Sequence, residues 1–357
     1  MAGALVTGAQ EDGGRQGDRL PQPRTPDPRE APALNWGVVA PGGIASTFAA
    51  AVRAHTQQNI VAVASRSADR ARAFASRFDV PAAYGSYADL LADRRVDVVY
   101  VASPHSEHFG QALLAIEAGK HVLVEKAFTR NAGEAERLVA AARERGVFLM
   151  EAMWTRCLPH IDVVRQTLDS GMLGEIQTLV ADHGQFMVPD AAHRLYAPEL
   201  AGGALLDLGV YPVSFASMVL GDFATVSAVG TKAFTGVDGQ ASVVVTNGDG
   251  AHGLISTTLF ARTPTTATVS GTLARLEVDG EFYAPATVRL IARDGELLDA
   301  YTPSRLDGGL AFEAAEVARC VHEGRLESGL MPLDETLRVM RTLDEIRLQL
   351  GTPFPGE

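Results

Sequence analysis

An aspartate and a tyrosine stand four residues apart in the stretch LLDLGVYPV, residues 205–213, which is otherwise apolar. On a helix, residues i and i+4 lie on one face, so Asp207 and Tyr211 would project together. Two interpretations remain open on this stretch alone. Tyr211 fills the core of a buried helix, or the two side chains handle a proton during catalysis.

A second candidate for chemistry is the pair Glu125 and Lys126, which follows the β-branched run HVLV. A lysine at the end of a buried strand is costly to desolvate, so Lys126 either reaches solvent or has a task. The pKa of a free tyrosine is about 10, and a nearby ammonium stabilises the phenolate. Lys126 could therefore bring the pKa of Tyr211 closer to the working range.

The first half of the chain alternates short β-branched runs with amphipathic stretches of helical length. Such alternation predicts right-handed βαβ units and a doubly wound parallel sheet. We expect this α/β domain to cover residues 34–155, after a disordered tail of residues 1–33 that lacks apolar periodicity.

Beyond that domain the pattern changes to alternating residues separated by turns such as NGDG and RDGE. Asn, Asp and Gly tolerate positive φ, so these are hairpin turns. Residues 156–357 are therefore expected to form an α+β domain with a large open antiparallel sheet, followed by two helices that pack back on the first domain.

The turn after the first predicted strand, GVVAPGGIAST, approximates a dinucleotide-binding fingerprint. Gly42 suits the close approach of a pyrophosphate, and Ala45 suits the packing of helix on strand. An alanine replaces the first glycine, which weakens the motif taken alone. The residues expected at the pyrophosphate are Ala40, Gly42, Gly43 and Ile44.

The second predicted strand ends in Ser65 and Arg66, where an NAD-binding protein usually carries an acidic residue. A hydroxyl and a guanidinium suit the 2′-phosphate of NADP(H), and Arg70 could add charge one turn later. NADP(H) is therefore preferred over NAD(H). The alternative is that Ser65 caps a helix and Arg66 is a solvated surface residue.

A further loop, ASPHSEHF, belongs to the carboxyl edge of the predicted sheet, where ligands of such folds bind. Two histidines three apart could suggest a metal, but no carboxylate or cysteine cluster accompanies them, so no metal site is expected. Residues of this loop expected to line the cofactor site, together with Glu125 and Lys126, are Ser103, Pro104, His105 and His108.

Bulk properties restrict the classes of partner. A formal net charge of −12 over 357 residues disfavours nucleic acid and anionic membranes. The two cysteines, Cys157 and Cys320, form no motif, which favours a reducing cytoplasm. We also find no signal-peptide pattern and expect no apolar run long enough to span a bilayer.

Several segments together, among them EKAF, MEAMWTR, HRLYAPELAGGALLDLGVYPV and GTLARLEVDG, resemble the glucose-fructose oxidoreductase, inositol dehydrogenase and MocA family. The resemblance runs from Leu34 to Pro355 and is greatest to its dimeric dihydrodiol dehydrogenase and NADP-dependent sugar dehydrogenase branch. It implies a Rossmann domain, an α+β domain, and a homodimer or homotetramer through the antiparallel sheet.

The resemblance also assigns roles to residues of this chain. Lys126 matches the family's catalytic lysine, although Ala127 stands where the family usually has proline. Asp207 and Tyr211 match a D-x-x-x-Y pair, with Tyr211 as acid/base and Asp207 as an orienting group. Residues that could line the substrate pocket are Trp154, Arg156, His193 and Arg194, each with an alternative structural role.

The expected function is NADP(H)-dependent hydride transfer to or from a secondary alcohol or carbonyl of a small sugar, polyol or cyclic diol. Two alternatives remain. A non-catalytic NADP(H) sensor or scaffold need not keep Lys126, Asp207 and Tyr211 together. An NAD-dependent glycosidase of the same family would be supported by an acidic residue at the end of the second strand, which Ser65 and Arg66 do not provide.

Overall fold

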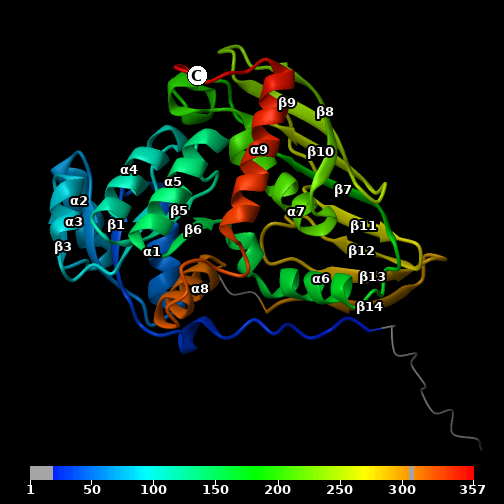
Figure 1. Cartoon of the computed structure of the whole chain (residues 1–357), viewed down its shortest axis with the longest axis horizontal. Helices are drawn as coiled ribbons and strands as arrows, with labels where there is room; N and C mark the ends of the chain where they lie inside the picture. The colour runs from blue at the N-terminus through cyan, green and yellow to red at the C-terminus, as the bar shows by residue number, and fades with distance from the viewer. Residues whose placement is uncertain (1–18, 305–308) are drawn as a thin grey trace, which may run out of the picture.

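The first half of the chain forms a six-stranded parallel sheet in the order β3-β2-β1-β4-β5-β6. We describe the protein from a computed structural model, which covers residues 19–304 and 309–357. The predicted doubly wound α/β domain is confirmed, and its elements occupy the left half of Figure 1. They are β1 (Asn35–Val39), α1 (Gly43–His55), β2 (Asn59–Ala64), α2 (Ala68–Phe78), β3 (Ala82–Tyr84), α3 (Tyr87–Ala92), β4 (Val98–Val101), α4 (His105–Glu117), β5 (His121–Glu125), α5 (Ala132–Arg145) and β6 (Leu149–Ala152).

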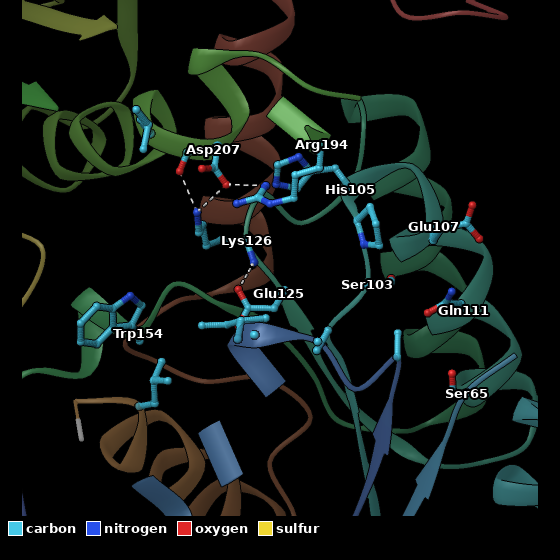
Figure 2. A pocket seen from close by; sticks show the side chains of 18 of the residues that line it. Ser65, Ser103, His105, Glu107, Gln111, Glu125, Lys126, Trp154, Arg194 and Asp207 are labelled. Atoms are coloured by element: carbon cyan, nitrogen blue, oxygen red, sulfur yellow. Dashed lines mark hydrogen bonds and ion pairs between the residues drawn. The ribbon is translucent and has the colours of Figure 1, made fainter. Parts of the chain in front are cut away.

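The order of strands reverses between β1 and β4, which creates the crevice where open α/β sheets bind ligands. The central strands are buried on both faces, as expected for a sheet covered by helices on each side. The fingerprint turn joins β1 to α1 and opens at the carboxyl edge of the sheet. That edge therefore faces the second domain with the loops that carry the candidate residues (Figure 2).

The second half of the chain forms an eight-stranded sheet in the order β14-β13-β12-β11-β7-β10-β9-β8. The predicted antiparallel sheet needs one correction, because β10 pairs with β7 in parallel and the sheet is therefore mixed. A parallel neighbour requires a crossover, and the segment with α7, β8 and β9 provides it. The strands are β7 (Ile176–Gly184), β8 (Phe223–Lys232), β9 (Asp238–Asn247), β10 (His252–Thr258), β11 (Ala267–Gly271), β12 (Ala274–Val278), β13 (Val288–Ala292) and β14 (Leu297–Tyr301).

Helices cover one face of this sheet and connect it to the first domain (Figure 1). α6 (Pro159–Asp169), α7 (Val210–Leu220) and α9 (Leu333–Leu350) pack on its strands. α9 also contacts α5, and α8 (Leu310–His322) contacts α1. The hydrophobic core is consequently continuous across both domains.

The segment LLDLGVYPV begins as a π-helical turn, Leu205–Gly209, and continues as α7. Short 3-10 helices occur at Pro28–Glu30, Trp154–Cys157, Arg194–Tyr196 and Pro198–Leu200. The segment Pro198–Leu220 has 23 residues and a mean hydropathy of 1.5. By these two criteria it is long and apolar enough to cross a membrane. The expectation that no run is long enough was therefore wrong, but 89% of the most apolar window in this segment is buried inside the protein, as in a core helix.

The predicted disordered tail of residues 1–33 differs from the structure in its second half, while residues 1–18 lie outside the described residues. Residues 19–33 run as a strap beneath both domains (Figure 1). Arg24 forms an ion pair with Asp162 of α6 at 2.9 Å, and the main chain of Leu20 donates to Asp299 of β14. Gln58 donates to the carbonyl of Pro32 beside the first domain. Polar contacts to side chains of both domains hold this segment in place. Such contacts cannot be predicted from amino-acid composition.

Candidate active site

A cavity of about 750 Å³ lies between the carboxyl edge of the parallel sheet and the start of α7. Its walls come from the loops after β1, β2, β4 and β5 and from elements of the second domain. Most of the side chains expected from the sequence line it, namely Ala40, Gly42, Gly43, Ile44, Ser65, Arg66, Arg70, Ser103, Pro104, His105, Glu125, Lys126, Trp154, Arg194, Asp207 and Tyr211.

Lys126 stands at the centre of the polar contacts in this cavity (Figure 2). Its Nζ donates to the main-chain carbonyl oxygen of Asp207 at 2.7 Å and lies 3.4 Å from Asp207 Oδ1. Arg194 Nη1 donates to the same carboxylate oxygen at 3.0 Å. Burial alone would raise the pKa of Asp207, but the charges of Lys126 and Arg194 outweigh it and hold that pKa well below its ordinary value. Asp207 is thus a carboxylate that orients two cations.

The π-helical turn and Pro212 together explain why the carbonyl of Asp207 is available to Lys126, because the residue five positions after Asp207 is this proline, which has no N–H. In such a turn the i→i+4 hydrogen-bond pattern is interrupted, and π-bulges are frequent at functional sites. Asp207 belongs to this turn, whereas Tyr211 belongs to α7. The two residues line the same cavity, as the four-residue spacing predicts, but in two different helical registers.

Tyr211 is held from both its hydroxyl and its ring. Trp154 Nε1 donates to Tyr211 Oη at 3.0 Å, and Lys126 Nζ lies 4.8 Å from the ring centroid. The ammonium therefore faces the ring rather than the hydroxyl. Burial raises the pKa of Tyr211 well above its ordinary value, and the Trp154 hydrogen bond opposes this only in part. The expectation that the pKa of Tyr211 comes closer to the working range needs correction, because the effect of burial outweighs that of the nearby charge.

Glu125 lies at the end of β5, below Lys126. One carboxylate oxygen accepts from the Tyr100 hydroxyl, and the other accepts from the main-chain N–H of Lys126 at 3.2 Å. The peptide bond between Lys126 and Ala127 is cis. Glu151, at the end of β6, accepts from the N–H of Phe128 at 3.1 Å. Two buried carboxyl groups thus fix the loop that carries Lys126.

The cofactor end of the cavity contains polar atoms that lack partners. Ser103 Oγ and Gln111 Oε1 are buried, and neither has a hydrogen-bond partner in residues 19–304 or 309–357. α1 begins without a side-chain cap, and a Cβ at Gly43 would meet nothing within 4 Å. Ala40 adopts φ +63°, the left-handed conformation that favours the glycine of the fingerprint. These features fit a dinucleotide whose pyrophosphate meets the start of α1.

At the far end of this cavity the charge is positive. Arg66 and Arg70 line it together with Ser65 at the end of β2, and both guanidinium charges act on Tyr87, as does the single opposing charge of Glu107. Ser65 Oγ accepts from the N–H of Ser67 at 3.2 Å, so Ser65 both lines the cavity and orders the turn. The cap of α2 is Ser67, not Ser65. The arrangement suits a 2′-phosphate.

Three predicted site residues do not line the cavity. Arg156 is buried and donates to Ser214 and to Glu335 at 2.6 Å, because a buried guanidinium needs a carboxylate partner. His193 is exposed, and its Nδ1 accepts from the N–H of Leu195 at 3.3 Å. His108 lies between the carbonyl oxygens of Ala127 and Ser103, at 2.9 and 2.8 Å. All three residues have structural roles in the part of the chain that the structure describes.

Sequence reasoning missed other residues of the cavity wall. Some lie next to predicted residues, namely Ser67, Ala102, Glu107, Gln111 and Leu208. The others come from segments distant in sequence, where only the position of His183 at the end of a strand gave a signal. They are Tyr87, His183, Gln185, Met187, Tyr283 and Leu310. Among the described residues, no group of three or more His, Cys, Asp and Glu side chains is placed to hold a metal ion.

Comparison with known proteins matches both halves of the chain. Residues 34–153 match the model of an oxidoreductase family with an NAD-binding Rossmann fold, and residues 161–277 match the GFO/IDH/MocA C-terminal domain. The chain is 36% identical over 334 residues to trans-1,2-dihydrobenzene-1,2-diol dehydrogenase of Bos taurus, covering 91% of this chain and 99% of the relative.

Two further proteins are similar over most of the chain. D-xylose 1-dehydrogenase (NADP(+)) of Hypocrea jecorina is 37% identical, with 90% of this chain and 93% of the relative covered. Among solved structures, a 3-ketoreductase from Actinomadura kijaniata in complex with NADP and TDP-benzene has a TM-score of 0.79 and 29% identity. This match covers 89% of the chain and 98% of the ketoreductase.

Proposed function

The chain belongs to the GFO/IDH/MocA oxidoreductase family and is an NADP-dependent oxidoreductase of sugar or diol hydroxyl groups, in which we propose that Tyr211 transfers the proton. The observation that carries this assignment is the single cavity shared by Tyr211, Lys126 and the basic end with Arg66. Neither the sensor nor the glycosidase alternative is favoured, since relatives over nine-tenths of the chain are dehydrogenases.

The residues that line the cavity fit NADP(H). The start of α1 at Gly42 and Gly43 would receive the pyrophosphate, and Arg66 with Arg70 would neutralise the 2′-phosphate. Lys126 and Glu125 lie at the opposite end of this cavity, toward Tyr211. When bound there, the nicotinamide supplies or accepts the hydride.

Tyr211 acts as a neutral hydroxyl before the reaction, because burial raises its pKa. In the reducing direction its proton goes to the carbonyl oxygen of the substrate, and the bond from Trp154 Nε1 stabilises the tyrosinate that remains. In the oxidising direction the same oxygen takes the proton back.

Lys126 and Asp207 position this chemistry rather than transferring the proton in our proposal. The ammonium of Lys126 faces the Tyr211 ring at 4.8 Å and is anchored by Asp207. A positive charge at this distance stabilises the tyrosinate during the reaction without needing to contact its oxygen. Arg194, tied to the same carboxylate, is left with further N–H groups for a substrate oxygen.

The test is NADP⁺ reduction over a panel of aldoses, inositols and dihydrodiols, together with the reverse reaction on the corresponding ketones or lactones. We expect Tyr211→Phe to lower kcat by about 10²- to 10⁴-fold while NADPH binding is retained. Tyr301→Phe, on β14 away from the cavity, is the matched control. Full activity of Tyr211→Phe on the best substrate would contradict the assignment of the proton to Tyr211.

We also propose a homodimer or homotetramer formed through the uncovered face of the mixed sheet. Val180, Leu254 and Val244 are exposed and lie in register on β7, β10 and β9, which makes an apolar row. Such a row on one face indicates an interaction surface. Light scattering of Val244→Lys should then show a smaller particle than the wild type.

Both cysteines are buried free thiols, which supports our further proposal of a reducing, cytoplasmic setting.

A further inference from the structure

Three polar side chains of the cavity wall have no part in the proposed proton transfer. They are His183 at the end of β7, Gln185 just after it, and Tyr283 between β12 and β13. The rings of His183 and Tyr283 both pack against Tyr211, with centroids 5.4 and 4.6 Å from its ring. These three residues, here called the polar wall, therefore border the place where a substrate meets Tyr211.

His183 holds the polar wall together. Its ring is stacked on Tyr283 with centroids 4.6 Å apart, and its Nε2 lies 3.1 Å from Gln185 Nε2. Burial, and then the charge of Lys126, lowers the pKa of His183 to about 4. A neutral imidazole has one donor and one acceptor nitrogen, so it can orient the Gln185 amide through a single hydrogen bond.

The polar wall keeps hydrogen-bonding capacity for a ligand. Within residues 19–304 and 309–357 the Tyr283 hydroxyl forms no hydrogen bond and the Gln185 side chain forms one only with His183; both residues are half-buried and line the cavity. One end of the amide and one hydroxyl consequently point to no protein group. A substrate that covered them with carbon would leave both unsatisfied, which is unfavourable in a buried site.

We infer that Gln185, oriented by His183, and the Tyr283 hydroxyl form a specificity subsite that binds substrate hydroxyls away from the reacting carbon. This inference rests on the proposed function and narrows its substrate class. A sugar ring carries hydroxyls on most of its carbons, and its C–H faces can pack on aromatic rings such as those of Trp154 and Tyr283. An arene diol has only its adjacent hydroxyl pair, which the reaction itself engages. The subsite therefore selects a polyhydroxylated sugar over an arene diol.

The experiment measures kcat and KM of the full-length protein with NADP⁺ on two kinds of probe. One is a panel of aldopentoses and aldohexoses that includes D-xylose, and the other is trans-1,2-dihydrobenzene-1,2-diol. We expect the wild type to have the higher kcat/KM on a sugar. A site built to bind a hydroxyl can reject the analogue that lacks it by about 10⁴-fold.

Gln185→Leu removes the amide and keeps a side chain of similar size. We expect its kcat/KM on the best sugar to fall about tenfold, mainly through KM, with less than about a threefold change on the arene diol. Tyr283→Phe, which keeps the stacked ring, should have the same direction of effect. Gln57→Leu, which makes the same change at an exposed residue between α1 and β2 outside the cavity, is the matched control. NADPH fluorescence shows whether each variant is folded and binds cofactor.

Equal losses on both substrates in Gln185→Leu and Tyr283→Phe would overturn the subsite, and so would a wild-type preference for the arene diol. In either case the proposed function would stand, because NADPH formation would still depend on Tyr211. If the wild type turned over no sugar and no diol, the proposed function would fail, and the subsite would fail with it.

Discussion

Lys126 Nζ donates to the carbonyl oxygen of Asp207 at 2.7 Å, which joins the end of β5 to the π-helical turn before α7. The contact crosses from the parallel sheet to the second domain. It therefore fixes the position of the ammonium relative to the ring of Tyr211, which follows Asp207 by four residues in α7. Asp207 contributes its main chain to this contact as well as its carboxylate.

Lys126→Met is expected to lower kcat by about 10²-fold or more, because it removes the charge that stabilises a tyrosinate in a buried site. NADPH affinity, measured by fluorescence titration, should change less than kcat. Lys232→Met removes an ammonium that donates to the carbonyl of Gly351, far from the cavity, and serves as control. Equal losses of kcat in Lys126→Met and Lys232→Met would show that the loss does not come from removing a charge at the catalytic cavity.

Arg66→Ala is expected to reduce kcat/KM for NADP⁺ by about 10- to 100-fold, since charge-assisted hydrogen bonds to a phosphate are among the strong ones. NAD⁺ has no 2′-phosphate, so its kcat/KM should be nearly unchanged. Arg72→Ala removes the same charge from an exposed site on α2 and is the matched control. Parallel losses with both cofactors would contradict the assigned role.

Ala40→Gly is expected to stabilise the protein by about 1 kcal/mol. Ala40 adopts φ +63°, which costs an L-residue about 1–2 kcal/mol, whereas glycine adopts it freely at a smaller entropic cost. Urea unfolding of both proteins gives the difference in free energy of unfolding. Ala64→Gly, in β2, should instead be destabilising. A loss of stability in Ala40→Gly would show that the turn does not need a glycine.

Glu151→Gln is expected to become more stable relative to the wild type as the pH rises. Burial raises the pKa of Glu151 from 4.5 to about 7 in the folded protein, so the native state binds more protons than the unfolded state between these values. Its stabilising contribution is complete below about pH 4.5 and is lost as the pH rises through about 7. The neutral amide lacks this dependence, which amounts to up to about 3 kcal/mol.

The measurement is the free energy of unfolding of both proteins from pH 5 to 8. Glu144→Gln, on the exposed face of α5, controls for the loss of a surface charge. The difference in free energy of unfolding between Glu151→Gln and the wild type could instead stay constant from pH 5 to 8. Glu151 would then already be ionised in the folded protein at pH 5.

The fold and much of the cavity follow from local patterns in the sequence. Alternating strands and helices dictate the parallel sheet, and the carboxyl ends of parallel strands share one edge, which brings Ser65, Ser103 and Lys126 to one cavity. The D-x-x-x-Y spacing similarly places Asp207 and Tyr211 at the same wall. Features of this kind can be predicted from the periodicity of each helix and strand alone.

Other features depend on contacts between distant segments, which a single sequence does not specify. The sequence indicates that Arg156 lines the pocket. Its ion pair with Glu335, 179 residues away, instead holds it in the core. The strap of residues 19–33 lacks periodicity and is ordered by partners such as Asp162. The parallel pairing of β7 with β10 likewise follows from the crossover and not from either strand.

The contacts of α8 with α1 and of α9 with α5 have a consequence for biosynthesis. The cofactor-binding domain is translated before the mixed sheet, yet two of its surface helices are covered by α8 and α9, which are translated only after all strands of that sheet. Domains usually fold as units in the order of synthesis. Here the nascent first domain must wait with apolar surface uncovered until α8 and α9 have been translated, which makes this interval the period when a chaperone would be most needed.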